Sequence, residues 1–422
     1  MRKHRVSTYS LLLMLVTFST AALAQNNTKS NPAPPIVADL PRQELDAVGL
    51  ALATVPADPL VRPDPLAAIF EPLDRLAVKA NPSEHLKFGA TYTFLDQYAT
   101  STPDNVRHDQ LSGRFDLNGD WAAYDHGSTA GAISILVRSG ANIGISQQFN
   151  LSDSVGSGRY LNCMQGGGPQ EPLTVNVLYW RQDFLHKRLS FYVGKIHPNQ
   201  HVSLSMYNND ERGQFLNGGN DGNLAVASGG TYAGGGAFEI QATSHIFIHA
   251  VAVDTEGASQ RSIETLVDRK YMEAVEVGWF AGSPGKQYRN YRMIMWRNDT
   301  KTLGSGFGGG VGFEHELANG WTPFGRFALA TNTGTTVKQI ESVGLAHVRP
   351  FGRSGDMFGL AFNYTAPSRS GKHHESVMES FYRLRLTKSI DLGPDVEVSI
   401  HPTYAAKAYT TTLVGMRMRV IF

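Results

Sequence analysis

From residue 85 to the C-terminus, apolar and polar residues alternate with a period of two in sixteen segments. This period is the pattern of strands that have one apolar and one polar face. Short turn sequences such as "HK", "TS", "ANG" and "LGP" link some segments, while the connections 139–172 and 197–233 are long and rich in Gly and Asn. The predicted strands are 85–97, 111–122, 129–138, 173–184, 188–196, 234–241, 245–254, 271–280, 288–297, 306–316, 321–330, 339–349, 356–365, 376–388, 394–401 and 411–422.

The even number of strands and the unequal connections predict an all-β fold, a 16-stranded antiparallel transmembrane β-barrel of an outer membrane. Backbone groups in hydrocarbon must all be hydrogen-bonded, so a sheet without edges is required there. The last strand, "TTLVGMRMRVIF", then has to pair with the first, "HLKFGATYTFL", and Phe422 is expected at the periplasmic aromatic girdle. A soluble propeller would show a repeated four-strand motif, which this sequence lacks.

The N-terminus has the layout of a cleaved secretory signal, residues 1–24. The basic stretch "RKHR" precedes the apolar run "LLLMLVTF", and the small residues "ALA" follow before the expected cleavage point. Residues 25–84 are rich in proline, and we expect a periplasmic leader with a short helix that Asp64 caps and Pro65 begins. The barrel domain is expected to comprise residues 85–422.

The composition excludes several other classes of protein. The chain has 38 Lys and Arg and 37 Asp and Glu, and three of the basic residues belong to the signal. No basic excess therefore points to nucleic acid. The lone cysteine, Cys163, has no partner for an intramolecular disulfide. No window of about 20 apolar residues after the signal predicts a membrane helix.

The alternation also predicts which side chains face the lumen. In the last strand, Val414, Met416 and Met418 share one face, and Arg417 and Arg419 lie on the other. An arginine on the lipid face near the membrane midplane costs about 2–4 kcal/mol, so these arginines should face inward. The same reasoning applies to further candidates, namely Arg383, Arg385, Glu397, Arg114, Asp116, Arg326 and Arg292. We expect Glu397 to be the acidic partner of the arginines on the neighbouring strands.

Three other patterns resemble a metal site, a nucleotide site or a catalytic pair, but each lacks the structural context that such a site needs. His197 and His201 flank Pro198 in a predicted loop, which does not favour a metal site. The stretch "GSGFGG" precedes a strand instead of opening a helix, which argues against a nucleotide site. Glu314 and Glu316 share one face and cannot oppose each other across a substrate as a glycosidase pair must. We therefore expect no metal, no cofactor and no enzymatic activity.

Four stretches resemble the OprB-type carbohydrate-selective porins: "RLSFYVGKIHP", "NDERGQFLNGG", "RPFGRSGDMFGLAFNY" and "ESFYRLRLTKSIDLGPDVEVSIHP", the last followed by the terminal strand. The resemblance covers about residues 80–422. It implies an outer-membrane barrel through which sugars diffuse, narrowed by extracellular loops and lined by arginines and acids. It also implies that Phe422 belongs to a signal read by the barrel assembly machinery. The usual "PDLQY" reads "PDVEV" here, which leaves the preferred sugar open.

A sugar-conducting role agrees with the chemistry of the predicted wall. Sugar hydroxyls both donate and accept, so Arg donors and acidic acceptors can replace water along a path. The segment 197–233 is the best constriction candidate, and its polar residues include Asp210, Glu211, Arg212 and Asn217. The alternative is a barrel for polysaccharide export or secretion with periplasmic partners. The expected partners are small carbohydrates, outer-membrane lipids, lipopolysaccharide and the assembly machinery, with the protein as a monomer or homotrimer.

Overall fold

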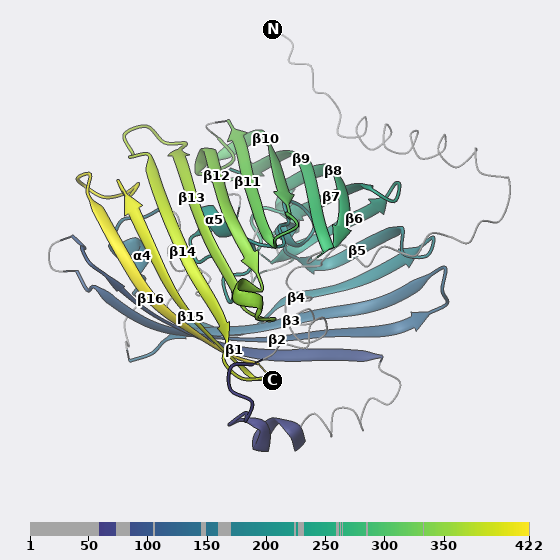
Figure 1. Cartoon of the computed structure of the whole chain (residues 1–422). Helices are drawn as coiled ribbons and strands as arrows, with labels where there is room; N and C mark the ends of the chain where they lie inside the picture. The colour runs from purple at the N-terminus through teal and green to yellow at the C-terminus, as the bar shows by residue number, and fades with distance from the viewer. Residues whose placement is uncertain are drawn as a thin grey trace, which may run out of the picture. The chain divides into compact units, whose positions relative to one another are not determined.

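The structure, a computed structural model, describes residues 59–72, 85–103, 106–144, 149–158, 170–222, 225–226, 232–258, 261, 263, 265–283, 286–331 and 333–421. Sixteen strands form a closed antiparallel barrel in which each strand pairs with its neighbours in the sequence (Figure 1). The strands are β1 Leu86–Ala99, β2 Asp109–Asp125, β3 Ala130–Asn142, β4 Gln170–Phe184, β5 Leu189–Ile196, β6 Ala233–Gln241, β7 Ile246–Asp254, β8 Tyr271–Ser283, β9 Lys286–Thr300, β10 Gly304–His315, β11 Trp321–Ala330, β12 Val337–Val348, β13 Met357–Pro367, β14 Glu375–Arg385, β15 Ile390–Ile400 and β16 Thr410–Ile421.

The pairing of β1 with β16 closes the barrel, as the sequence predicts. Phe94 lies opposite Met418, and Tyr98 lies opposite Val414. The signal peptide, most of the leader, Cys163 and Phe422 lie outside the described residues. The expected position of Phe422 therefore stays a prediction.

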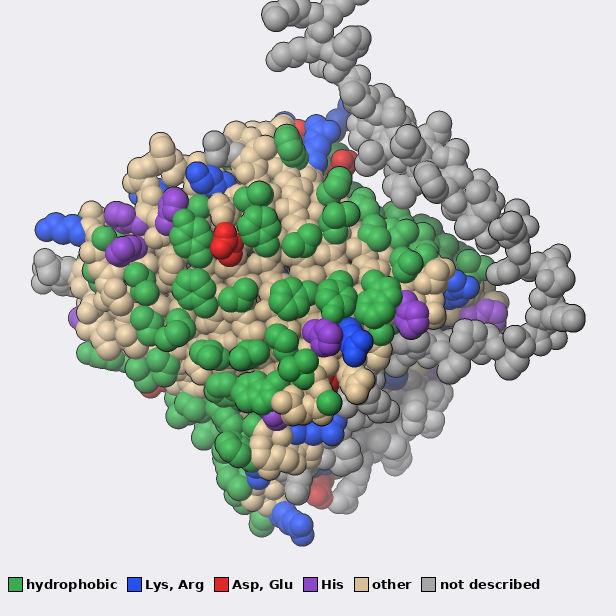
Figure 2. Space-filling model, turned by 45° about the horizontal axis from the view of Figure 1, so that its top comes forward, with side chains coloured by type: hydrophobic (Ala, Val, Ile, Leu, Met, Phe, Trp, Pro, Cys, Tyr) green, Lys and Arg blue, Asp and Glu red, His purple; other side chains and the backbone are tan. Residues whose placement is uncertain are grey.

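The two faces of the wall follow the predicted alternation. On β16, Val414 and Met416 have 50% and 45% of their surface exposed, whereas Arg417 and Arg419 have 3% and 2%. The same division between apolar outward and polar inward side chains recurs on β1, β2 and β14. Figure 2 shows the result, a broad field of hydrophobic side chains over the outer wall with Lys, Arg and His toward its edges. This apolar exterior is the surface that lipid chains cover.

The connections between the strands lie at the two ends of the barrel. Those after the even-numbered strands, such as 185–188, 242–245 and 386–389, lie at one end, which we name the short-turn end. The long β3–β4 and β5–β6 connections begin at the opposite end.

One predicted turn is wrong. The sequence "LGP" lies inside β15, and residues 386–389 form the turn instead, with the Leu386 amide donating to the Ile390 carbonyl over 2.9 Å. Pro394 lies opposite Met416 on β16, but Gly393 and Pro394 have no paired residue on β14. A proline lacks the N–H that a ladder needs, so this gap allows the strand to continue through it.

The described part of the leader contacts the barrel at the short-turn end. The amides of Leu60 and Val61 donate to the carbonyls of Arg385 and Leu386, over 3.1 Å and 2.8 Å. Asp64 Oδ1 accepts from the Leu66 amide over 3.0 Å, and residues 67–72 are helical. The expected boundaries of the signal (1–24), the leader (25–84) and the barrel domain (85–422) stay predictions. None of the described helices is long and apolar enough to cross a membrane.

Candidate functional site in the barrel lumen

The β5–β6 connection folds into the lumen because buried carboxylates on the wall accept its backbone amides. Glu276 of β8 accepts from the Ser203 amide over 2.8 Å, and Glu314 of β10 accepts from the Met206 amide over 2.8 Å. Buried backbone N–H groups need partners, and a charged acceptor makes a strong bond. The described residues of the segment predicted as a constriction therefore lie inside the barrel, where Figure 1 also shows the helix α5, Gly218–Asp221.

Glu379 of β14 is the third of these anchors. It accepts from the amides of Leu216 and Asn217, the latter over 3.1 Å, and from Asn220 Nδ2 over 3.0 Å. The Asn217 side chain also caps α5 by accepting from the Gly219 amide over 2.9 Å. Asn217 thus has a structural position in the connection, and a direct role in a solute path stays a proposal.

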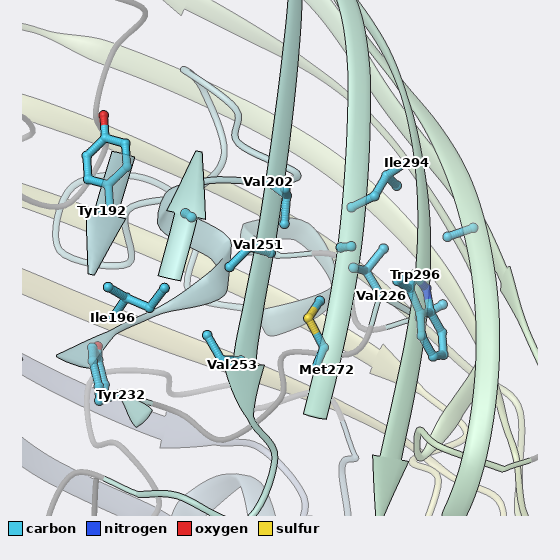
Figure 3. Close-up of a cluster of buried hydrophobic side chains, with 14 of the residues drawn as sticks. Tyr192, Ile196, Val202, Val226, Tyr232, Val251, Val253, Met272, Ile294 and Trp296 are labelled. Atoms are coloured by element: carbon cyan, nitrogen blue, oxygen red, sulfur yellow. The ribbon is translucent and has the colours of Figure 1, made fainter. Parts of the chain in front are cut away.

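Part of the lumen wall is apolar, although the expected wall was polar and charged throughout. Inward side chains of β7, β8 and β9 form a buried cluster with Val202, Val226 and Tyr232 of the connection (Figure 3). The wall residues of this cluster include Val251, Val253, Met272, Ile294 and Trp296. Phe215 packs nearby against Phe381 and Phe324, with ring centroids 4.9 Å and 5.7 Å away. The connection therefore rests partly on apolar side chains and partly on the charged residues of the wall. The arginines of the predicted basic cluster lie on β14 and β16, and we use the term polar side for β1, β2 and β13–β16.

The predicted basic cluster is present on this polar side, but its acidic partner is Asp391. Arg385 Nε lies 2.6 Å from Asp391 Oδ1, and Arg419 Nε donates to Asp391 Oδ2 over 3.0 Å. Glu397 lies opposite Glu379 and accepts from Gln97 Nε2 over 2.9 Å, so the expected pairing of Glu397 with the arginines is wrong. Asp391 was missed because reading "LGP" as a turn placed it outside the strand.

A second charged group lies on β2 and β3. Asp116 accepts from Arg114 Nε over 2.9 Å and from Arg138 Nε over 2.6 Å. Arg114 also pairs with Glu211 of the connection. Arg138 was not among the predicted lumen residues. On this strand Ile133, Ile135 and Val137 face outward, so the same alternation places Arg138 and Gly140 inward.

Asp210, Glu211 and Arg212 bring the connection against the basic cluster. Arg212 Nε donates to Asp210 Oδ1 over 2.8 Å, and Arg417 Nη1 donates to the Glu211 carbonyl over 2.7 Å. Burial alone would raise the pKa of Asp210, but Arg212 and Arg419 outweigh it and hold that pKa well below its usual range. Asp210 therefore stays ionised, and its attraction to Arg419 holds the connection against β16.

Gly213 follows directly in the chain and lies close to the wall. A Cβ placed there would lie 3.0 Å from Arg383 Nη1 and 3.3 Å from Arg419 Nη1. A larger residue at this position would displace the guanidinium groups from the connection.

Of the remaining candidates, Arg326 contacts the connection directly, and Arg292 pairs with Glu314, which accepts from the connection. Arg292 Nη1 donates to Glu314 Oε2 over 3.2 Å, and Arg326 Nη2 donates to the Asn208 carbonyl over 3.1 Å. Both are buried and belong to the support of the connection. The structure thus brings all the sequence-predicted lumen residues inside the barrel, in separate groups instead of one continuous ladder.

The arginines differ in how their charge is compensated. Arg114, Arg292, Arg385 and Arg419 are ion-paired. Within the described part of the chain, Arg326, Arg383 and Arg417 make no ion pair, and Arg326 Nε and Nη1, Arg383 Nε and Arg417 Nη2 are buried without hydrogen-bond partners. The guanidinium group of Arg417 lies over the Phe381 ring, 5.7 Å from its centroid. Arg383, which is half-buried, and Arg417 lie beside the β5–β6 connection and keep these donors unused.

The β3–β4 connection also folds back onto the polar side, which the sequence did not predict. Glu375 at the start of β14 accepts from Ser157 Oγ over 2.6 Å and from the Gly158 amide over 3.1 Å. Leu151 and Val155 pack in a buried cluster with Ala99, Val377 and Leu413. Residues 149–158 of the connection therefore cover the inner surface of β1, β14 and β16 at the end opposite the short turns. No group of three or more potential metal ligands occurs among the residues described.

Comparison with known proteins places these features in context. The family model for the carbohydrate-selective porins of the OprB family matches residues 133–317 and 278–422. Porin AaxA of Chlamydia abortus is 24% identical over 257 residues, which are 58% of this chain and 56% of that protein. Porin AaxA of Chlamydia pneumoniae is 33% identical over 102 residues, which are 22% of this chain and 23% of that protein. The matched stretches thus span less than two thirds of either relative.

The fold agrees with solved porin structures. A structure of Pseudomonas putida OprB at high pH superposes with a TM-score of 0.67 and 12% sequence identity, covering 82% of this chain and 96% of that one. A mutant porin of Rh. blastica gives a TM-score of 0.50 at 10% identity, covering 80% of this chain and 100% of that one. At these identities the likeness establishes the barrel fold alone.

Proposed function

Because this chain belongs to the OprB family of carbohydrate-selective porins, we propose that small carbohydrates diffuse passively through its lumen, along the wall of β1, β2 and β13–β16. The sixteen-stranded barrel of this family is an outer-membrane protein of Gram-negative bacteria. The proposed passage involves no chemical step and no cofactor. The proposed partners are the permeating sugar, the surrounding lipid and lipopolysaccharide, and the assembly machinery, with the barrel as a monomer or a homotrimer.

The availability of Arg383 and Arg417 carries this proposal. Each keeps one buried guanidinium nitrogen without a partner beside the connection. Glu211 of the connection pairs with Arg114 through one carboxylate oxygen and keeps 15% of its side chain exposed as a further acceptor. A sugar hydroxyl can accept from the guanidinium group and donate to an acidic oxygen, replacing two contacts with water. Each exchange has a small net free energy, so the solute enters and also leaves.

The ion-paired arginines have a different proposed role. Arg385 and Arg419 satisfy Asp391, and Arg114 satisfies Asp116. Partners that bind each other have little capacity left for a solute. We therefore assign Arg383 and Arg417 to solute contact and the paired arginines to holding the wall and the connection in place.

Liposome swelling with sugars of increasing size tests the function. We expect swelling with monosaccharides and a rate that falls as the sugar grows, because the two folded-in connections limit the bore. A lipid-only liposome preparation is the control. Absence of swelling with every sugar, from correctly folded protein, would contradict passive diffusion and favour the export alternative.

We further propose that the short-turn end faces the periplasm, since long loops of such barrels lie outside the cell. In a Cys163→Ser background, a membrane-impermeant maleimide should label Lys407→Cys on intact cells. Ser244→Cys should react only after lysis. Both residues are exposed, Lys407 in the β15–β16 connection and Ser244 in the β6–β7 turn. Labelling of Ser244→Cys alone on intact cells would invert the orientation.

A further inference from the structure

Three cross-strand rows cross the outer wall on β8, β9 and β10 near the short-turn end. The outermost row places Ala281, Arg289 and His315 side by side. The next row, two residues further along each strand, consists of Trp279, Tyr291 and Phe313. The third row consists of Val277, Met293 and Val311. The wall thus changes from polar to aromatic to aliphatic, which is the order a lipid presents from headgroup to acyl chain.

The aromatic row is exposed on the outside of the barrel. Trp279 and Tyr291 have 38% and 40% of their surface exposed, and their ring centroids are 5.8 Å apart. The Tyr291 hydroxyl is 2.6 Å from His315 Nδ1, which fixes the imidazole beside the row. Exposed aromatic side chains of this kind mark the level of the membrane interface.

Arg289 lies on the same outward face and lacks a counter-ion among the residues described. It makes no ion pair there, and its Nε is buried without a hydrogen-bond partner. An arginine on the lipid-facing surface of a barrel is tolerated near the interface, where it costs little compared with the membrane midplane. Its guanidinium group still presents a planar fork of donors that matches phosphate oxygens.

Arg297 at the other end of β9 provides a contrast. It is also outward and exposed, but it lies directly opposite the acidic residue Glu273 on β8. Eight residues separate the two arginines, so they are about 27 Å apart along the strand. At the usual tilt this separation approaches the height of the apolar band, about 25 Å. Both arginines therefore lie near an interface, and only Arg297 faces an acid across the sheet.

We propose that Arg289 and His315 bind the phosphate of an anionic glycerophospholipid in the leaflet at the short-turn end. The glycerol region lies over Trp279 and Tyr291. The acyl chains lie along Val277, Met293 and Val311, whose exposed fractions are 42%, 55% and 53%. The lipid phosphate supplies the negative charge that the protein does not provide at Arg289. This site is on the outer wall and is independent of solute passage through the lumen.

Native mass spectrometry of the delipidated full-length barrel, titrated with phosphatidylglycerol, tests the proposal. Arg289→Gln should weaken binding of the first lipid by about tenfold, the loss expected for a charge-assisted contact. The matched variant Arg297→Gln should bind like wild type. Inorganic phosphate should not compete, because it lacks the acyl chains. Heat-modifiable migration in gels checks that each variant is folded.

Three results would overturn the site. They are wild-type binding by Arg289→Gln, an equal loss in Arg289→Gln and Arg297→Gln, or displacement of the lipid by inorganic phosphate. If Arg289→Gln does not fold, Arg289→Lys and His315→Ala decide the question. The lysine should retain charge but lose the fork, and the alanine should remove one donor, so each should weaken binding by about threefold. Wild-type binding by both would equally reject the site.

Discussion

Replacement of Glu379 by glutamine is expected to raise single-channel conductance several-fold and to make the current noisier. Glu379 accepts from the amides of Leu216 and Asn217 and from Asn220 Nδ2. Glutamine turns one of the two acceptor oxygens into a donor group that faces these donors. A buried donor left without a partner costs about 1–3 kcal/mol, so the connection should leave the lumen for part of the time. The strands retain their pairing, and the barrel should remain folded. Planar-bilayer recordings of wild type and Glu379→Gln measure the effect.

Glu341→Gln is the matched control for this experiment. Glu341 is exposed on the outer face of β12 and accepts from Gln339 Nε2 over 2.7 Å, away from the inward connections. The same chemical change there should leave conductance as in wild type. Unchanged conductance in Glu379→Gln would show that the apolar contacts of Phe215 and Val202 hold the connection without the carboxylate. Gain of conductance in both variants would show that the effect is not specific to the anchor.

The double substitution Arg383→Gln and Arg417→Gln is expected to weaken sugar block of the ion current by about tenfold. These two side chains retain donors, and a hydrogen bond from a charged group contributes about 1.5–3 kcal/mol. The substitution also removes two positive charges from the lumen. Anion preference should therefore fall, most clearly at low salt, where screening is weakest. Sugar titrations and reversal potentials in planar bilayers measure the two effects separately.

Arg385→Gln with Arg419→Gln is the control with the same change in charge. These arginines neutralise Asp391, and Arg419 also lies 3.7 Å from Asp210. Removing them should shift the reversal potential too, but sugar block should stay within about twofold of wild type, since their donors already serve the carboxylates. Loss of sugar block in the control pair, with the first pair unaffected, would reverse the assignment of contact and support.

Local periodicity alone determined much of this fold. A strand buries alternate residues, so the outward position of Met416 and the inward positions of Arg417 and Arg114 could be predicted without knowing any partner strand. The strand count followed from the same alternation, and the closure of β16 on β1 followed from the requirement that no edge remain in the membrane. The largest difference between a predicted and an observed strand end is four residues, as at 138 and Asn142.

The prediction from local sequence misplaced the start of β15, and the cause was a proline. Pro394 suggested a turn, yet it lies within β15 where the ladder to β14 is interrupted. That error moved Asp391 out of the predicted strand and left Glu397 as the expected partner of the arginines. The sequence of β15 does not show that Pro394 has no paired residue on β14. Only the register of the two strands shows that the proline lies inside a strand.

The contents of the lumen depended entirely on contacts between residues far apart in the sequence. The alternation says that Glu276, Glu314 and Glu379 face inward, but not that each accepts backbone amides from the β5–β6 connection. It also does not say which inward side chains are covered by Val202 and Val226, because a loop has no period that identifies its partners. The sequence by itself therefore determined the barrel and the two faces of its wall. Only the tertiary structure decided which arginines are neutralised and which, like Arg383 and Arg417, retain donors, because ion pairing depends on distances across the closed sheet.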